Sequence, residues 1–375
     1  MSWVVAGRVA SVVAVTAGLA VGCARFDESA SKPFTPAPTV HPEGMGPTNA
    51  PKTPPSAAPR PTGPCIDPDP LVIGTCLDTT GGVAPLPDGQ QGLVTERVSG
   101  RILKVTVVTP DQPQPQPVEV ARLDVDAAGD GGLTDVALSP TYSEDGLIYA
   151  YVTTPSDNRV VRIGAGGSVK PILTGIPKGS TGNRGAIDFL DDKMLVLTGD
   201  GGNPGAAADR GSLAGKLLRI DDPAPGGSNP QVLASGVGVA GGVCPDHKDS
   251  IWFTDRTAAA DRLQRVAADG TVSTAWTWPD HPGVAGCAAA VDGVAIAMTD
   301  AKALAFADAD PKTHAVTTAP AMAAQDKYGA LNGAALAPDG FVWVGTINKQ
   351  GKPGPFDDRV VRIPPPKGGA GGGPD

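Results

Sequence analysis

Cysteines, histidines and clustered acids are the residues best able to bind metals or act as nucleophiles, and this sequence shows few patterns of them. The five cysteines never stand in Cys-x-x-Cys spacing, which argues against a zinc site or thioredoxin-like chemistry. The four histidines are scattered. We interpret them as isolated loop residues, although His247 and His281 could approach each other. The other two are His41 and His314.

One acidic run resembles a calcium-binding loop in part. The stretch that begins at Asp124 has acids at its first and third positions, as EF-hand loops do. Its fifth position is Ala128, however, and Asp135 stands where the bidentate glutamate belongs. Acids in surface turns are common without a metal. The sequence therefore predicts no metal site.

Charge and glycine spacing exclude two further classes of function. The net charge is −9, whereas nucleic-acid binding needs clustered lysine and arginine. The run GVGVAGG, residues 236–242, matches the GxGxxG dinucleotide pattern, but that pattern requires a following helix. A strand with aromatic residues is expected there instead. The sequence thus predicts neither a nucleic-acid partner nor a nucleotide-binding fold.

The N-terminus has the features of an export signal. Residues 1–22 contain one basic residue and an apolar stretch shorter than the roughly 20 residues that span a bilayer. The stretch ends in Leu-Ala-Val-Gly before Cys23, which resembles the lipobox of bacterial lipoproteins. We therefore predict a signal peptide over 1–22 and fatty acyl chains such as palmitate on Cys23. The protein would then be anchored on the outer face of a bacterial cell membrane. The alternative is an ordinary secretory signal with an incidental cysteine.

The remaining cysteines are predicted to form disulfides. If Cys23 carries lipid, four cysteines are left, and an oxidising compartment allows two bridges among them. Proximity in the sequence favours a bridge between Cys65 and Cys76. The second bridge then joins Cys244 and Cys287.

Two segments have no periodic apolar pattern and should not form a core. Residues 23–64 are rich in proline, threonine and serine, which indicates a semi-extended tether. Residues 367–375 are a glycine-rich tail that we expect to be disordered. The folded domain is therefore predicted over residues 65–366.

Within this domain one pattern returns six times. Small residues precede an apolar strand, an Asp/Gly turn and a second apolar strand, and a further short strand follows, usually with a basic residue at its start. The spacing of 40 to 60 residues is typical of repeat architectures. A hairpin cannot bury both faces alone, but six arranged radially can. We predict an all-β, six-bladed propeller with four-stranded blades. The paired segments lie at 81–96, 131–153, 183–200, 240–255, 285–300 and 332–346.

Several of these segments resemble the soluble quinoprotein glucose/sorbosone dehydrogenases. The resemblance rests on VAPLPDGQQGLVTERVSGRILKV from residue 83, GDGGLTDVALSP from 129, TGDGGN from 198 and SLAGKLLRID from 212. It extends over about residues 81–363. It implies a six-bladed propeller. In the enzymes of this family, pyrroloquinoline quinone (PQQ) and calcium lie at the top of the central channel, and aldoses are oxidised there.

The family's functional positions are substituted in this chain. The catalytic histidine, which acts as general base, falls on Gly182, and glycine has no titratable group. A PQQ-contacting arginine falls on Gly238, and an Arg-x-Arg pair falls on Ala330 and Asn332. A glutamine falls on Ala128. Because PQQ is a tricarboxylate, losing these cations would remove charge-assisted contacts of about 1.5–3 kcal/mol each.

The sequence therefore predicts that the scaffold is kept and the chemistry is lost. The main hypothesis is a non-catalytic binding module for a cell-envelope glycan, a small ligand or an envelope protein. A PQQ- and calcium-dependent or diverged sugar dehydrogenase is the first alternative, and it requires charged residues that converge at the mouth by another route. A structural assembly module is the second, and it requires an exposed apolar patch on the blade edges. The candidate mouth residues are Asp130, Asn183, Arg184, Asp200 and Asp246.

Overall fold

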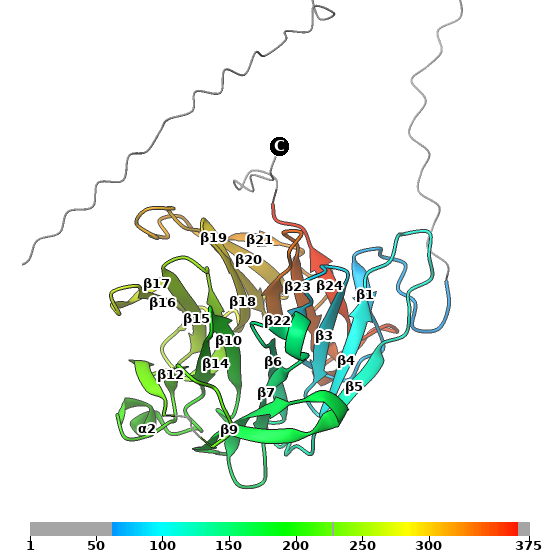
Figure 1. Ribbon diagram of the computed structural model, residues 1–375. Helices are drawn as coiled ribbons and strands as arrows, with labels where there is room; N and C mark the ends of the chain where they lie inside the picture. The colour runs from blue at the N-terminus through cyan, green and yellow to red at the C-terminus, as the bar shows by residue number, and fades with distance from the viewer. Residues whose placement is uncertain (1–61, 227–228, 367–375) are drawn as a thin grey trace, which may run out of the picture. The chain divides into compact units, whose positions relative to one another are not determined.

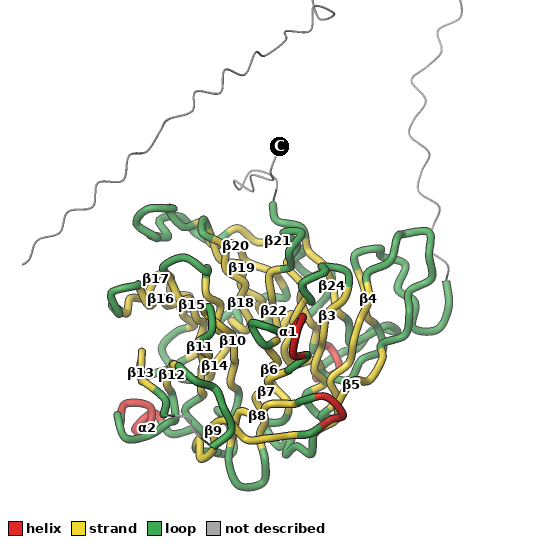
Figure 2. Tube along the Cα trace, viewed as in Figure 1, coloured by secondary structure: helices red, strands yellow, loops and turns green. Residues whose placement is uncertain are grey.

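The computed structural model describes residues 62–226 and 229–366. The predicted signal peptide, the lipid site at Cys23 and nearly all of the tether lie outside these residues. Within them, no helix has both the length and the apolar character needed to cross a bilayer. The helical segments are short, and Figure 2 shows them as small interruptions in a chain built of strands. They are α1 (Tyr142–Asp145), α2 (Pro204–Ala208), η2 (Ala165–Gly167) and η3 (Asn348–Gln350).

The strands form six four-stranded antiparallel sheets, which confirms the predicted six-bladed propeller. The first strands of the blades gather in the middle of the domain (Figure 1). From the inner to the outer strand, blade 1 is β2 (Thr80–Pro85), β3 (Gln91–Glu96), β4 (Arg101–Thr106) and β5 (Val118–Arg122), and blade 2 is β6 (Leu133–Leu138), β7 (Ile148–Thr153), β8 (Asn158–Ile163) and β9 (Val169–Ile176). In the same order, blade 3 is β10 (Gly185–Leu190), β11 (Lys193–Thr198), β12 (Lys216–Ile220) and β13 (Gln231–Ser235), and blade 4 is β14 (Val239–Pro245), β15 (Ser250–Arg256), β16 (Asp261–Ala267) and β17 (Val272–Trp278). Blade 5 is β18 (Val284–Ala290), β19 (Gly293–Met298), β20 (Ala303–Asp308) and β21 (Ala321–Ala323), and blade 6 is β22 (Leu331–Leu336), β23 (Val342–Thr346), β24 (Val360–Ile363) and β1 (Val72–Gly74).

Blade 6 takes its outer strand from the beginning of the domain. Val72 pairs with Val361 in an antiparallel ladder, so β1 joins the two ends of the propeller ring. The repeat pattern does not predict this, because β1 has only three residues and precedes the first repeat. The predicted disulfide between Cys65 and Cys76 is confirmed, and it ties the segments on either side of β1.

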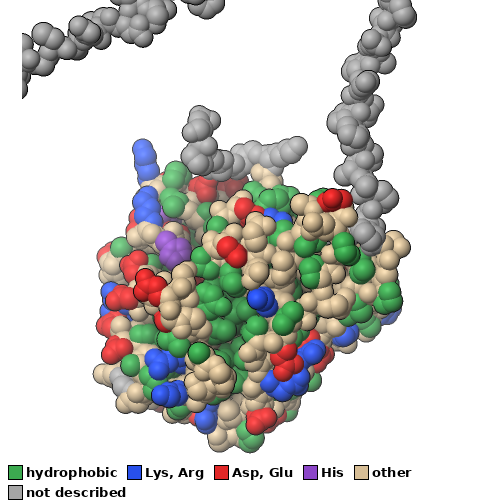
Figure 3. Space-filling view, turned by 45° about the vertical axis from the view of Figure 1, so that its right-hand side comes forward, with side chains coloured by type: hydrophobic (Ala, Val, Ile, Leu, Met, Phe, Trp, Pro, Cys, Tyr) green, Lys and Arg blue, Asp and Glu red, His purple; other side chains and the backbone are tan. Residues whose placement is uncertain are grey.

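The core lies between neighbouring blades. Between blades 2 and 3, Tyr149 and Phe189 meet edge to face with ring centroids 5.2 Å apart, and Met194 is fully buried beside them. The second predicted disulfide, Cys244–Cys287, is also confirmed and joins the first strands of blades 4 and 5. On the face seen in Figure 3, hydrophobic side chains gather at the centre and charged ones toward the periphery.

Glycines let the six first strands approach the axis. A Cβ atom added at Gly333 of β22 would lie 2.4 Å from the carbonyl oxygen of Gly81 in blade 1. A Cβ atom at Gly286 of β18 would lie 2.4 Å from the backbone nitrogen of Ala334 in blade 6. Because the atoms met are backbone atoms, a side chain at either position would force the neighbouring strand to shift. The small residues that open each predicted repeat therefore have a geometric cause.

The substitution Gly286→Ala tests this constraint. We expect it to lower the free energy of unfolding by about 1–3 kcal/mol, because the added methyl group overlaps the backbone of the next blade. Gly211→Ala is the matched control, since its Cβ would meet no atom closer than 3.5 Å. Urea unfolding of both variants makes the comparison, and equal midpoints would contradict the explanation.

Candidate functional site

The first strands enclose a central cavity of about 420 Å³. Most of its lining is glycine, alanine, proline and other apolar residues. Its charged lining residues are Asp135 of β6, Asp188 of β10 and Arg184, which directly precedes β10, and His247 lies at the far end. The cavity is therefore an apolar channel with a few ionisable groups.

Two carboxylates on adjacent blades face this channel. Asp135 accepts hydrogen bonds from the N–H groups of Ile187 (2.8 Å) and Val136 (2.9 Å), and Asp188 accepts one from Phe189 (2.7 Å). Burial raises the pKa of Asp135 to about 7 and that of Asp188 to about 6. The charge of Asp188 adds to the rise at Asp135. From the sequence, Asp135 is considered only within a calcium-loop pattern that is rejected, and Asp188 is not identified as a candidate site residue. An acid inside an otherwise apolar strand is the signal that identifies both.

Asp130 and Asn183, two predicted mouth residues, meet beside the channel. The Asp130 carboxylate accepts the N–H groups of Gly182 (2.9 Å) and Asn183 (3.0 Å), and the side-chain amide of Asn183 (3.3 Å). Asn183 is fully buried and also donates to the carbonyl of Gly179 (2.9 Å). Asp130 of the loop before β6 therefore holds the loop before β10. The side-chain NH₂ group of Asn183 is therefore engaged in hydrogen bonds within the protein.

The positions aligned with the family's base and arginine have no room for side chains. At Gly182, φ is +69° and an added Cβ would lie 2.4 Å from Oδ1 of Asp200. At Gly238 a Cβ would lie 2.1 Å from the carbonyl oxygen of Arg256. Asp200 itself accepts the N–H of Gly202 (2.8 Å). Glycine is thus required at both positions by the local packing.

Arg184 crosses the propeller axis. It leaves blade 3, and its guanidinium donates to the side-chain oxygen of Asn332 on β22 of blade 6, which stands opposite in the ring of six. The amide of Asn332 donates in turn to the carbonyl of Thr80 (2.9 Å) in blade 1. Burial, followed by the positive charge of Arg256, lowers the pKa of Arg184 to about 10. A polar link between opposite blades therefore spans the top of the channel.

Arg256, at the end of β15, is a second mouth cation that the sequence does not reveal. Its Nε atom is buried without a hydrogen-bond partner, and neither Arg184 nor Arg256 pairs with a carboxylate within the described residues. A third arginine, Arg97, is directed to backbone carbonyls of the Asp130 loop, including that of Gly129 (3.3 Å). Arg97 thus supports the mouth, while Arg184 and Arg256 carry positive charge without a paired acid.

Two clefts extend from this point, with volumes of about 750 and 890 Å³. Both are lined by Asp130, Arg256 and Asp300, so they meet beside Arg256. The second also includes Asp200 and His281, whose Nδ1 lies 3.2 Å from Oδ1 of Asp261. The first has more cations than acids, although the chain as a whole is acidic. Its charged lining residues are Arg184, Arg256, Lys302, Lys327, Lys352, Arg359, Asp130, Asp300, Asp326 and Asp357.

The other aligned positions are spread around the same rim. Ala330 lines the first cleft, and its N–H donates to the side chain of Asn348 (2.8 Å). Ala128 lies in an exposed turn and donates to Asp126 (2.9 Å). Neither alanine offers a polar side chain to a ligand.

Asp246 does not lie at the mouth. It follows the end of β14, in the hairpin to β15, whereas the other candidates precede first strands or follow second strands. Successive strands run in opposite directions, so this hairpin is at the far end of the channel. The prediction that Asp246 lines the mouth is therefore corrected. The sequence places it in a loop but does not say which end of the blade that loop occupies.

Known proteins share this fold and part of the sequence. The glucose / sorbosone dehydrogenase family model matches residues 77–239, which span blades 1 to 3. The PQQ-bound aldose sugar dehydrogenase of Streptomyces coelicolor is 28% identical, with a TM-score of 0.69 over 78% of this chain and 95% of that one. A glucose dehydrogenase-type oxidoreductase of Thermus thermophilus is 25% identical, with a TM-score of 0.66 over 78% and 98%. No curated protein matches the sequence.

The fold and the channel thus define a six-bladed propeller with a polar mouth. The resemblance expected from the sequence is confirmed: the domain is a glucose/sorbosone dehydrogenase-like propeller. The matched region includes Gly182, where the family's base is expected, and ends one residue after Gly238.

The raised carboxyl pKa values predict a pH-dependent stability. For Asp188 the folded pKa of about 6 exceeds the ordinary value of 3.8, so ionisation opposes folding. This penalty is absent below about pH 4 and complete above about pH 6, and Asp135 extends it to about pH 7. We expect Asp188→Asn, which keeps an oxygen for the Phe189 N–H, to reduce the stability lost across this range. Urea unfolding of both proteins at several pH values is the measurement, and parallel profiles would contradict the assignment.

Proposed function

We propose that this protein is a non-catalytic binding module whose mouth holds a small anionic ligand, such as a sugar acid. The observation that carries the proposal is the pair of arginines, Arg184 and Arg256, which lack carboxylate partners among the described residues. Two neighbouring cations in a partly buried site repel each other. A bound carboxylate would relieve this repulsion with charge-assisted hydrogen bonds.

The size of both clefts and the excess of cations in the first suit such a ligand. Volumes of about 750 and 890 Å³ are in the range of small-molecule sites. Asp200, Asp300 and Lys302 add donors and acceptors for hydroxyl groups. A free sugar acid and an acidic sugar at the end of an envelope glycan share this chemistry.

The absence of catalysis is inferred from the base position. A side chain at Gly182 would overlap Asp200, so no histidine could stand there without rebuilding the loop. The residues at Gly182 and Gly238 therefore do not fit the family's arrangement around PQQ. No step of sugar oxidation is derived from them.

A PQQ-dependent or diverged sugar dehydrogenase is the second candidate. This alternative requires charged residues that converge at the mouth, and Arg184 and Arg256 line the same cleft there. The pair of His281 and Asp261 on the same cleft as Arg256 is a candidate for a relocated base. The relative from Streptomyces coelicolor, described as PQQ-bound, supports the same alternative.

The assembly-module hypothesis has less support. Large exposed apolar side chains occur on the outer strands of blades 1 to 5, but only one or two stand on each. This spacing around the rim does not make one continuous patch within the described residues. They are Val118, Val120, Val169, Val232, Val272 and Met322.

Arg256→Gln tests the binding proposal. We expect the purified protein to bind D-glucuronate more tightly than D-glucose, and the variant to lose about tenfold or more in glucuronate affinity, because one charge-assisted contact contributes about 1.5–3 kcal/mol. Isothermal titration calorimetry measures both. Arg219→Gln is the control, since Arg219 pairs with Asp221 (2.8 Å) in blade 3 away from the clefts.

The same samples separate the two candidates. PQQ and calcium are added, and aldose-dependent dye reduction is followed. Turnover would replace the binding proposal with the dehydrogenase. Absence of both glucuronate binding and turnover would remove the anion site at Arg256.

We also propose that Cys23 carries acyl chains and anchors the protein on the outer face of the cell membrane. Each buried CH₂ group contributes about 0.8 kcal/mol, so two or more chains give stable attachment. In a bacterial host, we expect the wild-type chain in the membrane fraction and labelled by an alkyne fatty acid. Cys23→Ser should abolish the labelling and leave the chain uncleaved. Cys76→Ser is the control, because Cys76 forms a disulfide. The fatty-acid labelling of this variant should persist.

A further inference from the structure

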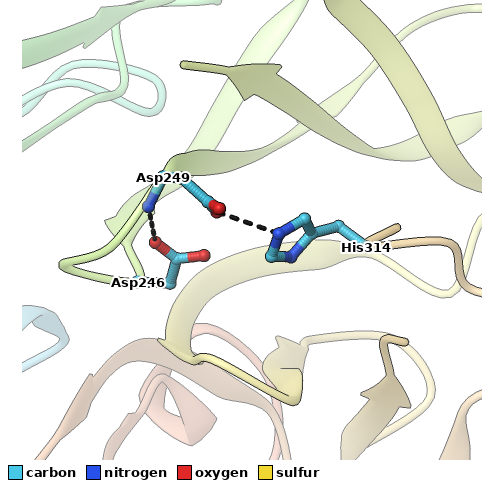
Figure 4. A group of neighbouring side chains, drawn as sticks. All are labelled: Asp246, Asp249 and His314. Atoms are coloured by element: carbon cyan, nitrogen blue, oxygen red, sulfur yellow. Dashed lines mark hydrogen bonds and ion pairs between the residues drawn. The ribbon is translucent and has the colours of Figure 1, made fainter. Parts of the chain in front are cut away.

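Three side chains from two blades converge at the end of the channel away from the mouth. Asp246 and Asp249 belong to the hairpin between β14 and β15 of blade 4, and His314 belongs to the loop between β20 and β21 of blade 5. One potential ligand atom from each lies within 4.8 Å of the others. Figure 4 shows the carboxyl groups of Asp246 and Asp249 on the side of the His314 ring that faces blade 4.

The hydrogen bonds of the group leave two buried atoms without a partner among the described residues. Nε2 of His314 lies 2.9 Å from Oδ1 of Asp249. Oδ1 of Asp246 accepts three backbone N–H groups of its own hairpin, from Lys248 (3.0 Å) to Ser250 (3.0 Å). Oδ2 of Asp246 and Nδ1 of His314 have no partner among the described residues.

Both of these atoms are buried. Asp246 is 6% exposed and His314 is 5% exposed. Leaving a buried carboxylate oxygen without a partner is costly, and the cost is higher when the group is charged. The neighbouring cation Arg265 does not relieve it: Nε of Arg265 donates to Oγ of Ser250 (2.7 Å), its guanidinium lies over the Trp252 ring, and Oδ2 of Asp246 has no partner among the described residues. The site therefore brings together two carboxyl groups and one imidazole, and one carboxyl oxygen, Oδ2 of Asp246, is buried without a partner among the described residues.

We propose that Asp246, Asp249 and His314 bind a divalent transition-metal ion of the Zn²⁺ type. One imidazole and two carboxylates form a ligand set that suits Zn²⁺, whereas Ca²⁺ and Mg²⁺ prefer oxygen ligands alone. Asp249 is 38% exposed, which leaves a side of the site open to solvent for a water ligand and for access of the ion. The site is separate from the proposed function, because it lies at the opposite end of the channel.

The ion would have a structural role. It would fasten the loop that contains His314 in blade 5 to the hairpin of blade 4. The Cys244–Cys287 disulfide already links the same two blades, and Asp246 follows Cys244 by two residues. The sequence predicts no metal here, because His314 is far from the two acids along the chain and no spacing motif joins them.

Zinc binding by the full chain, prepared without a histidine tag and treated with EDTA, tests the proposal. We expect calorimetry to show one Zn²⁺ per chain, and the melting temperature to rise with Zn²⁺ concentration. Ca²⁺ and Mg²⁺ should give no comparable shift. Asp249→Asn and His314→Gln should each weaken Zn²⁺ binding at least about tenfold. Because Asp249 is partly exposed, its variant should fold even if the His314 variant does not.

His281→Gln is the matched control. It removes a histidine that also contacts an aspartate, at the mouth, where Asp261 is its partner. Its Zn²⁺ affinity should equal that of the wild type. Absence of saturable binding, or binding that Asp249→Asn leaves unchanged, would overturn the proposal. If no saturable binding is found, buried water would instead hydrogen-bond to Oδ2 of Asp246 and Nδ1 of His314.

Discussion

The fold depends on how closely six strand backbones can approach a single axis. Five of the six first strands contain glycine, and two glycines directly precede the sixth, β6. At Gly286 and Gly333 even one methyl group would overlap the backbone of an adjacent blade. Since packed interiors leave no spare volume for such atoms, the composition of the first strands is fixed by geometry. The ring then closes through β1, which completes blade 6 from the other end of the domain.

The close approach of the first strands also determines which side chains and ligands can occupy the central channel. In a channel lined by backbone and short side chains, one long side chain can reach from wall to wall. Arg184 does so and bonds to Asn332 on the opposite blade. Below it, Asp135 and Asp188 sit where burial raises their pKa values. A ligand is therefore more readily held above the link, in the clefts that meet at Arg256, than inside the channel.

Much of the fold could be predicted from the sequence, because repeats and cysteine counting report on local and neighbouring structure. Six repeats required a radial arrangement, and the spacing of the four cysteines within the domain predicted both disulfides. The site was less accessible. Arg184 and Asn332 are 148 positions apart and meet only because blades 3 and 6 are opposite in the ring. Asp246 was assigned to the wrong end, since a loop's residue types do not reveal the direction of the strand before it.

The charge of the chain and the charge of its mouth act over different distances. A net charge of −9 repels large polyanions, whose many charges remain outside the clefts. Screening limits that repulsion to about 8–10 Å at physiological salt. Inside the first cleft, Arg184, Arg256 and four further cations outnumber the four acids of the lining, and their fields are less screened than those of the distant surface acids. Under the proposed function, an anion small enough to enter is attracted by the site while larger polyanions are excluded, which suits a ligand of sugar-acid size.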